Sequence, residues 1–196
     1  MKKAKKVLLL ALCAVLLVGA TIAGTVAYLT STTTEVKNTF TAGNVKITLD
    51  EAPVDANGKK LDGVRVTANS YKLLPGHEYD KDPTIHVDAN SEDCWLFVKV
   101  ENSIAGIEAE ETIAKQLADN GWTSVSGATN VYAYSKAASA GDNIEVFKSF
   151  KIKGDITNDV LAAYAGKTIE VTGYAVQKDG FASATDAWAK ASATWN

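Results

Sequence analysis

Apolar and polar side chains alternate over residues 45–50. Val45, Ile47 and Leu49 point to one side of an extended chain and the residues between them point to the other, which is the period of a half-buried β-strand. Burying each of these three side chains stabilises a fold by roughly 1.5–3 kcal/mol. Left unpaired, the segment would lose that stabilisation and expose backbone N–H and C=O groups that can pair with another chain. The strand must therefore pair, either within its own domain or with a neighbouring molecule.

The strand-forming character extends upstream, with one interruption. Residues 31–34 are polar and mostly β-branched, which is compatible with an extended chain. Phe40 and Val45 are an odd number of residues apart, so one regular strand cannot place both on the same face. The intervening 42–44, Ala-Gly-Asn, therefore predicts a bend or bulge that changes the register.

Downstream, short strands are predicted between turn signals, many at the spacing of roughly 8–12 residues that is typical of all-β domains. They are expected at 64–66, 71–74, 84–87, 94–100, 122–126, 130–134, 144–152 and 168–176. The run 94–100 carries apolar residues on both faces, with Trp95 and Phe97 on one and Leu96, Val98 and Val100 on the other. This pattern indicates a central strand that is covered on both sides.

Helices are predicted only as short inserts. One is expected at 109–118, one from a Thr157 cap to Gly166, and one after the capping box formed by Ser183 and Asp186. The regular strand–helix alternation of parallel sheets is absent. The sequence therefore predicts an all-β fold, an antiparallel β-sandwich with two or three peripheral helices.

The N-terminus has the three-part layout of a secretory signal peptide. Four lysines within residues 1–6 precede an apolar run, 7–18, and then small residues. We expect cleavage between Ala27 and Tyr28, although cleavage after residue 20 or 23 is also sterically acceptable. The competing interpretation is a retained helical anchor, because residues 7–34 carry no charge and about 20 apolar residues span a bilayer. Either way the lysines stay inside and the rest is exported.

The predicted organisation is thus a signal segment, 1–27, and one domain, 28–196. The chain has 20 basic and 23 acidic side chains, and the signal segment holds four lysines and no acid, so the mature part has 16 and 23 and a net charge of −7. Such a surface argues against nucleic-acid binding and favours solubility outside the cell. Cys94 is alone after cleavage, which excludes an intramolecular disulfide and predicts a buried thiol.

No catalytic constellation is found in the sequence. The run beginning His77-Glu78 resembles a zinc-protease helix, but Lys81 stands where the second histidine is needed, and His86 is the only other histidine. The loop 88–93 resembles a calcium loop without its obligatory glycine. We therefore predict no catalytic, cofactor or metal site and no enzyme activity. Trp95 and Trp188 are interpreted as core residues, with a carbohydrate-binding aromatic face as the alternative.

Several stretches resemble the TasA/camelysin family of Gram-positive bacteria. They are the late cleavage region 24–30 followed by 38–50, then 74–76 (Leu-Pro-Gly), 81–84, 91–99, 174–177 and 179–181. This resemblance spans nearly the whole chain and is most specific in the signal and first strand. It implies a jelly-roll-like sandwich and processing by a SipW-type signal peptidase. Some members assemble into extracellular biofilm fibres, in which the N-terminal strand of one subunit completes the sheet of the next.

The resemblance and the strand pattern lead to one functional hypothesis. We expect a secreted or cell-surface structural subunit that associates with itself into fibres, and with other matrix proteins as further candidate partners. Its membrane contact is limited to the uncleaved signal. Residues 28–50 are the candidate donor strand, with Phe40, Val45, Ile47 and Leu49 as the inserting side chains. The alternative is that this strand pairs within its own domain.

Two other functional classes remain open. The chain is alternatively a monomeric module that binds cell-wall glycan or a host surface through aromatic side chains. Camelysin-like members also carry a metalloprotease label, but the usual zinc motif is missing from this sequence.

Overall fold

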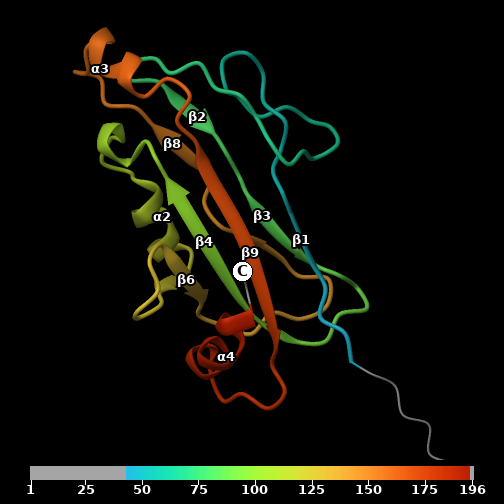
Figure 1. The fold of residues 1–196 in the computed structure, drawn as a ribbon. Coiled ribbons are helices and arrows are strands. Elements are labelled where there is room, and N and C mark those ends of the chain that lie inside the picture. The colour runs from blue at the N-terminus through green and yellow to red at the C-terminus, as the bar shows by residue number, and fades with distance from the viewer. Residues whose placement is uncertain (1–42, 195–196) are drawn as a thin grey trace, which may run out of the picture. The chain divides into compact units, whose positions relative to one another are not determined.

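The computed structural model describes residues 43–194 (Figure 1). The predictions for the signal segment 1–27, the cleavage site at Ala27 and Tyr28, and Phe40 all lie outside the described residues. None of the helices within 43–194 combines the length and the apolar character that crossing a membrane requires.

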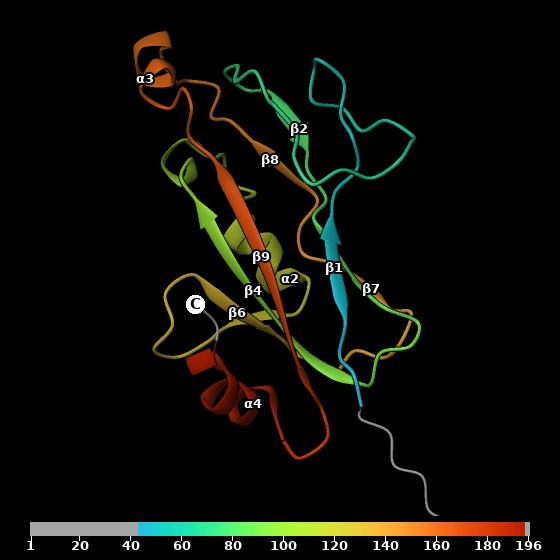
Figure 2. The same cartoon turned by 45° about the vertical axis from the view of Figure 1, so that its right-hand side comes forward.

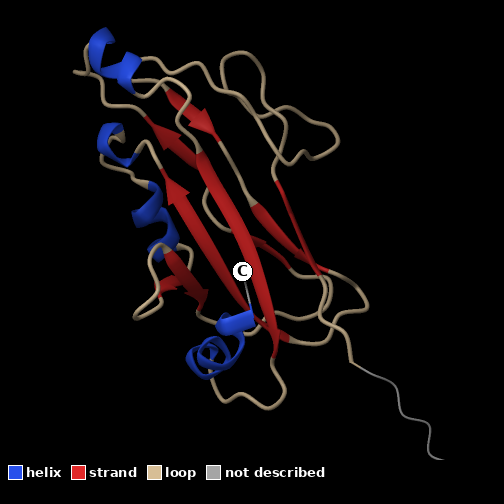
Figure 3. Cartoon of the chain, viewed as in Figure 1, coloured by secondary structure: helices blue, strands red, loops and turns tan. Residues whose placement is uncertain are grey.

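The described chain is built mainly from short strands (Figure 3). The strands are β1 (Ile47–Asp50), β2 (Glu78–Asp80), β3 (Thr84–Val87), β4 (Cys94–Asn102), β5 (Trp122–Ser124), β6 (Val131–Tyr134), β7 (Asn143–Glu145), β8 (Ser149–Lys151) and β9 (Ile169–Gln177). The helices are α2 (Ile113–Asp119), α3 (Asn158–Ala163) and α4 (Ala184–Ala191), with short 3-10 turns at Ala105–Ile107 and Ser192–Thr194.

All strand pairs are antiparallel, and the strands form two layers. One layer has the order β1-β3-β7 and is continued by the pair β2-β8. The junction between the two pieces is bridged by a hydrogen bond from Lys81 N to Lys148 O (3.0 Å) and one from Val146 N to Pro83 O (2.8 Å). The other layer has the order β5-β6-β4-β9. The predicted antiparallel all-β, sandwich-like architecture is confirmed.

The main hydrophobic core lies between the two layers. Ile85 and Phe150 from the first layer and Leu96 and Val98 from the second are at most 1% exposed and belong to one packed cluster. Burial of such side chains is the largest favourable contribution to the fold. Cys94 lies in the same cluster and is fully buried, as predicted.

The central strand β4 is covered on both faces, as its pattern predicts. Its outer face carries Trp95 and Phe97, and α4 packs there. The rings of Phe97 and Trp188 lie 5.2 Å apart, so Trp188 covers the sheet. Ser183 caps α4 through its side chain, which accepts a hydrogen bond from Asp186 N, so the predicted cap at Ser183 is confirmed.

Several predicted elements are wrong. Residues 64–66 and 71–74 do not form strands, and only Val66 makes an isolated bridge, with Glu51. The single strand predicted over 144–152 is two strands with a break. The predicted helix at 109–118 begins only at Ile113, because Ala109 N instead donates a hydrogen bond to Lys151 O (2.8 Å). The three-residue strand β2 was not predicted.

Candidate functional site

Two strand edges face each other along one side of the sandwich. Among the strands of residues 43–194, β1 pairs only with β3 and β9 pairs only with β4, so each is an edge strand of its layer. Figure 2 shows β1 and β9 side by side and running in opposite directions. We call the facing free edges of these two strands the open seam.

The backbone groups that border the open seam follow from strand geometry, because successive residues of a strand direct their N–H and C=O groups to opposite sides. On β1, Asn44 O and Lys46 O accept hydrogen bonds from the β3 side, both at 2.9 Å. Residues 47 and 49 therefore direct their backbone groups away from β3, towards β9.

The same reasoning applies to β9. Thr168 O accepts from Ser103 N (3.0 Å) and Lys178 N donates to Asp93 O (2.8 Å), so even-numbered residues pair with β4 and its extensions. The odd-numbered residues 169–177 then face the open seam. Within residues 43–194 no hydrogen bond joins β1 to β9. Among residues 43–194, the backbone groups that β9 directs to the seam therefore have no strand partner, and on β1 the same holds for Ile47 and Leu49, whereas Glu51 is paired with Val66.

A groove of about 1070 Å³ opens along part of this seam. One wall is formed by the end of β1 with the following Glu51, residues 49–51, and by the loop 66–73; the other is formed by residues 167–172 and α3. Apolar side chains reach it from the core, among them Leu73, Ile104, Phe150, Leu161 and Val171. The groove therefore combines apolar side chains with bare strand edges at its sides.

One end of the groove is closed by a close approach of β1 to β9. A Cβ atom added at Gly173 would lie 3.5 Å from the Cδ1 atoms of both Ile47 and Ile85. The absence of a side chain at Gly173 therefore lets the two isoleucines reach β9 at this point. We call this contact the closed end of the groove. The other end lies at α3 and Gly166.

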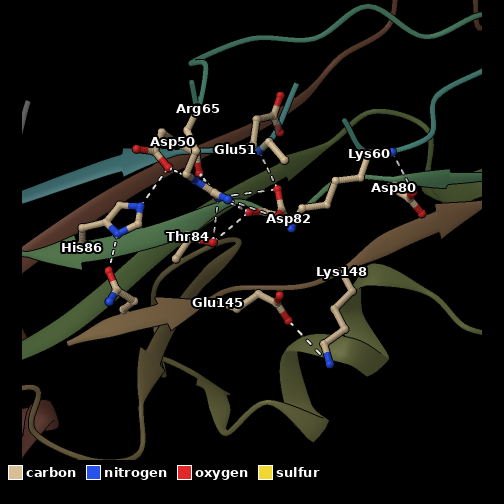
Figure 4. Close-up of polar contacts among 12 residues, drawn as sticks. Asp50, Glu51, Lys60, Arg65, Asp80, Asp82, Thr84, His86, Glu145 and Lys148 are labelled. Atoms are coloured by element: carbon tan, nitrogen blue, oxygen red, sulfur yellow. Dashed lines mark hydrogen bonds and ion pairs between the residues drawn. The ribbon is translucent and has the colours of Figure 1, made fainter. Parts of the chain in front are cut away.

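Arg65 fastens the loop that forms one wall (Figure 4). Its guanidinium pairs with the carboxylates of Asp50 and Asp82, and its Nη2 donates to Thr84 Oγ1 (2.9 Å) and Asp82 O (2.9 Å). Planar guanidinium groups suit such multiple, charge-assisted contacts. One arginine thus ties the loop to β1 and to the start of β3.

The acids of this cluster have low pKa values. Burial raises the pKa of Asp50, but hydrogen bonds from Arg65 and His86 outweigh it and hold the pKa below its ordinary value. Burial also raises the pKa of Asp82, but hydrogen bonds donated by Lys60, Ala52 N and Arg65 outweigh it and lower the pKa. Both carboxylates are therefore stabilised in their charged form.

The rest of the loop wall is held by a second set of polar contacts. Asn69 Nδ2 donates to Glu51 Oε1 and to Ala52 O, both at 2.9 Å, and Lys81 pairs with Glu51 at 2.5 Å. The hydroxyl of Tyr71 donates to a backbone carbonyl, that of Asp80 (3.0 Å). The loop 66–73 is thus ordered by side-chain contacts although it contains no strand.

On the opposite side of the sandwich, the edge of the segment 146–151 is bonded to other parts of the chain. The amide of Gln116, on α2, accepts hydrogen bonds from Lys148 N (3.0 Å) and Ser149 N (3.2 Å) and donates to Ser149 O (2.8 Å). Asn120 Nδ2 donates to Val146 O (3.2 Å), and Ala109 N pairs with β8. Side chains and backbone therefore cover the edge of the segment 146–151, which contains β8, and we call this edge the closed side.

The remaining residues singled out from the sequence form no reactive centre. His77 contacts Asn57 O through Nε2 (2.8 Å), and His86 lies between Asp50 and Asn143. Burial raises the pKa of the Cys94 thiol to about 11, which makes it a poor nucleophile. Among the described residues, no cluster of three or more histidine, cysteine, aspartate or glutamate side chains is arranged to hold a metal ion.

The predicted donor residues that the structure describes lie within their own domain. Ile47 and Leu49 are in β1, paired with β3, and together with Val45 they pack against the main core. Sequence reasoning missed the free edge of β9 and the loop wall. One feature of the sequence could have pointed to the loop wall: Arg65 is the only arginine among the 20 basic residues.

The chain matches no family model, no curated protein and no solved structure. Function is therefore inferred from the groove and its surroundings.

Proposed function

We propose that the chain is a secreted structural subunit of an extracellular fibre or biofilm matrix, and that its groove receives the N-terminal segment of another copy. The fold expected from the family resemblance, a jelly-roll-like sandwich, belongs to this proposal. So does export through the signal segment, with release by a SipW-type peptidase at Ala27 and Tyr28. Release would act as the switch for assembly, because an uncut N-terminus remains tied to the membrane.

The open seam is the observation that carries the proposal. An extended peptide placed in it would find backbone partners along β9 at one side and at Leu49 of β1 at the other, while its inward side chains would reach the apolar part of the groove. This is the chemistry of β-strand addition, in which backbone hydrogen bonds give affinity and alternate side chains give specificity. A small polar ligand would leave the backbone groups of both edges unpaired.

The best-supported donor is the segment 28–42. Val45, Ile47 and Leu49 are already used inside their own domain, which favours for them the alternative of internal pairing. Phe40 and the residues before it precede β1 in the chain and lie outside the described residues, and we propose them as the segment that enters a neighbour. A contact between one copy's N-terminus and another copy's groove is heterologous, and it builds an open filament if its rotation does not close.

The test compares the mature protein, 28–196, with a version that begins at residue 43. We expect fibres in electron micrographs of the longer protein and only single copies of the shorter one. The shorter protein is its own folding control, because the described core lies within 43–194 and should unfold at the same urea concentration. Fibres of normal appearance from the protein that begins at residue 43 would refute the proposal.

The two alternative functions have less support. Trp188 packs against Phe97, which does not favour an open carbohydrate-binding face at that position. A metallopeptidase needs a metal site, and the described histidines, His77 and His86, contact protein oxygen atoms in separate places.

A further inference from the structure

One ion pair in the wall of the groove is buried on both sides. The ammonium of Lys81 and the carboxylate of Glu51 lie 2.5 Å apart, and their side chains are 10% and 5% exposed. In every other ion pair of residues 43–194, at least one of the two side chains is more than a quarter exposed. Taking two charges out of water is costly, and their attraction offsets this cost only in a favourable geometry. The Lys81 pair is therefore unlike the surface ion pairs of the rest of the described chain.

The carboxylate of Glu51 also holds a side-chain amide. Its Oε2 contacts Nζ of Lys81, and its Oε1 accepts a hydrogen bond from Nδ2 of Asn69 (2.9 Å). An amine and an amide thus lie on the two oxygens of one carboxylate. The other polar contacts of Asn69 fix the amide in one orientation: Nδ2 also donates to Ala52 O (2.9 Å), and Oδ1 accepts from Val54 N (3.2 Å). The carbonyl oxygen of the amide therefore faces a backbone donor.

These groups are the ones that the exchange of an amide nitrogen requires. A neutral lysine amine is a nucleophile, a carboxylate beside it accepts its proton, and a backbone N–H stabilises the oxyanion that forms when an amide is attacked. The surroundings contain little water, because burial raises the pKa of the neighbouring Tyr71 hydroxyl, and the charge of Glu51 adds to this effect. The flexible stem of Lys81 allows Nζ to turn from Glu51 towards Cγ of Asn69.

We propose that Lys81 and Asn69 form an isopeptide bond within one chain, and that Glu51 moves the protons. Nζ of Lys81 gives one proton to Glu51 and then attacks Cγ of Asn69 as a neutral amine. The new C–N bond leaves a negative charge on Oδ1, which faces Val54 N. Glu51 passes its proton to Nδ2 and takes one from Nζ, the electron pair on Oδ1 restores the carbonyl, and Nδ2 leaves as ammonia. No oxidant or further reactant is needed.

The product suits its surroundings better than the ion pair does. A buried ammonium and a buried carboxylate are replaced by an uncharged amide and a protonated Glu51, which removes the cost of keeping two charges away from water. Ammonia can leave through the groove, because Glu51, Asn69 and Lys81 all line it. The bond joins the loop 66–73 covalently to the segment between β2 and β3. It forms within a single copy and does not depend on the function proposed above.

The test is mass spectrometry of the mature protein, 28–196, after it has folded and been denatured again. We expect a mass lower than that of the sequence by one molecule of ammonia. Trypsin does not cleave after a lysine whose Nζ is acylated, so digestion should yield residues 66–72 linked to residues 73–99. Fragmentation of this branched peptide should place the bond between Asn69 and Lys81.

Two variants separate the roles of the residues. Lys81→Arg keeps a cation beside Glu51 but cannot supply a neutral amine, and Glu51→Gln keeps a similar shape but cannot move a proton. We expect both variants to have the full mass of their sequences. The matched control is Lys60→Arg, because Lys60 pairs with Asp82 (2.8 Å) in the same wall and takes no part in the reaction, so this variant should still lose ammonia. Circular dichroism shows whether each variant is folded.

A folded mature protein that keeps the full mass of its sequence would overturn the inference, whether or not the variants fold. Loss of ammonia with residues 66–72 released unlinked would also overturn it, because Asn69 would then have formed a cyclic imide with its own backbone. Loss of ammonia from Lys81→Arg or Glu51→Gln would contradict the role given to that residue. None of these results bears on fibre formation, so the inference and the proposed function can fail separately.

Discussion

The closed side and the open seam differ in whether the backbone groups at their strand edges have hydrogen-bond partners. On the closed side, the amide of Gln116 takes the place of a missing strand and satisfies the backbone of residues 148 and 149. Across the open seam, within the described residues, nothing spans from β1 to β9, although the two strands approach closely at Ile47 and Gly173. An exposed edge is a liability that natural proteins usually cover. The contrast therefore supports the proposal that another segment pairs at the seam.

We expect the largest loss of unfolding free energy from a substitution that removes the hydrogen bonds of the closed side. Gln116→Ala removes an acceptor and a donor from a side chain that is 8% exposed and leaves backbone groups of residues 148 and 149 without partners. Each unsatisfied buried group costs about 1–3 kcal/mol, so we expect a total loss of roughly 3 kcal/mol in unfolding free energy. Urea unfolding of the protein that begins at residue 43 measures it.

The matched control for this prediction is Thr172→Ala on the open seam. Thr172 is exposed, and replacing such a residue usually changes stability by less than about 0.5 kcal/mol. Equal losses from the two variants would contradict the distinction between a covered and an uncovered edge.

We expect a smaller loss of unfolding free energy from a substitution in the groove wall. Arg65→Ala leaves the carboxylates of Asp50 and Asp82 without their shared partner. Because the Arg65 and Asp50 side chains are about a quarter exposed, solvent reduces the loss, and we expect about 1–2 kcal/mol. Hydrogen exchange should show faster exchange in the loop 66–73 but not in α2. Unchanged exchange of that loop would mean that Arg65 does not hold the wall.

The contributions of the two sides to the free energy of unfolding should also change in opposite directions as the pH falls. Burial raises the pKa of Glu108, which accepts a hydrogen bond from Ile113 N at the start of α2, so its ionisation opposes folding at neutral pH. This penalty fades as the pH falls towards 4.5. The lowered pKa values of Asp50 and Asp82 contribute stability that is present above about pH 3.8 and is lost below it, as each carboxylate is protonated.

Stability should therefore pass through a maximum on the acid side of neutrality. Urea unfolding between pH 7 and pH 2.5 tests this order. Glu108→Gln keeps an oxygen that accepts from Ile113 N and should abolish the initial rise. Arg65→Ala should weaken the later fall. A Glu108→Gln variant that keeps the full rise would assign it to another group.

The strands with clear alternation were predictable from the sequence. β1, β4, β9 and the cap of α4 follow from local patterns of apolar residues and capping side chains. Residues 64–66 show a similar pattern and yet form no strand, since Arg65 is anchored by its side chain and Val64 is 89% exposed. The three residues of β2 are too few to show a pattern. Short segments are decided by tertiary contacts that the local sequence does not encode.

The groove was not predictable for a different reason. Whether a strand is central or at an edge depends on which segments pair with it, and the alternation of β9 looks the same in either case. The position of β1 beside β9 is likewise a property of the assembled layers. The sequence does indicate that residues 28–50 favour an extended chain, but it leaves open which part serves the domain and which part remains for a neighbour.

Gly173 has a mechanical consequence in a fibre of the proposed kind. Because Ile47 fills the space above this glycine, an incoming strand can advance only to a fixed depth, which sets the repeat distance from one subunit to the next. Tension along the fibre would then act along the inserted strand and across its hydrogen bonds, which lie perpendicular to the strand direction. Such bonds share a load in shear, whereas a peeling force would break them one after another.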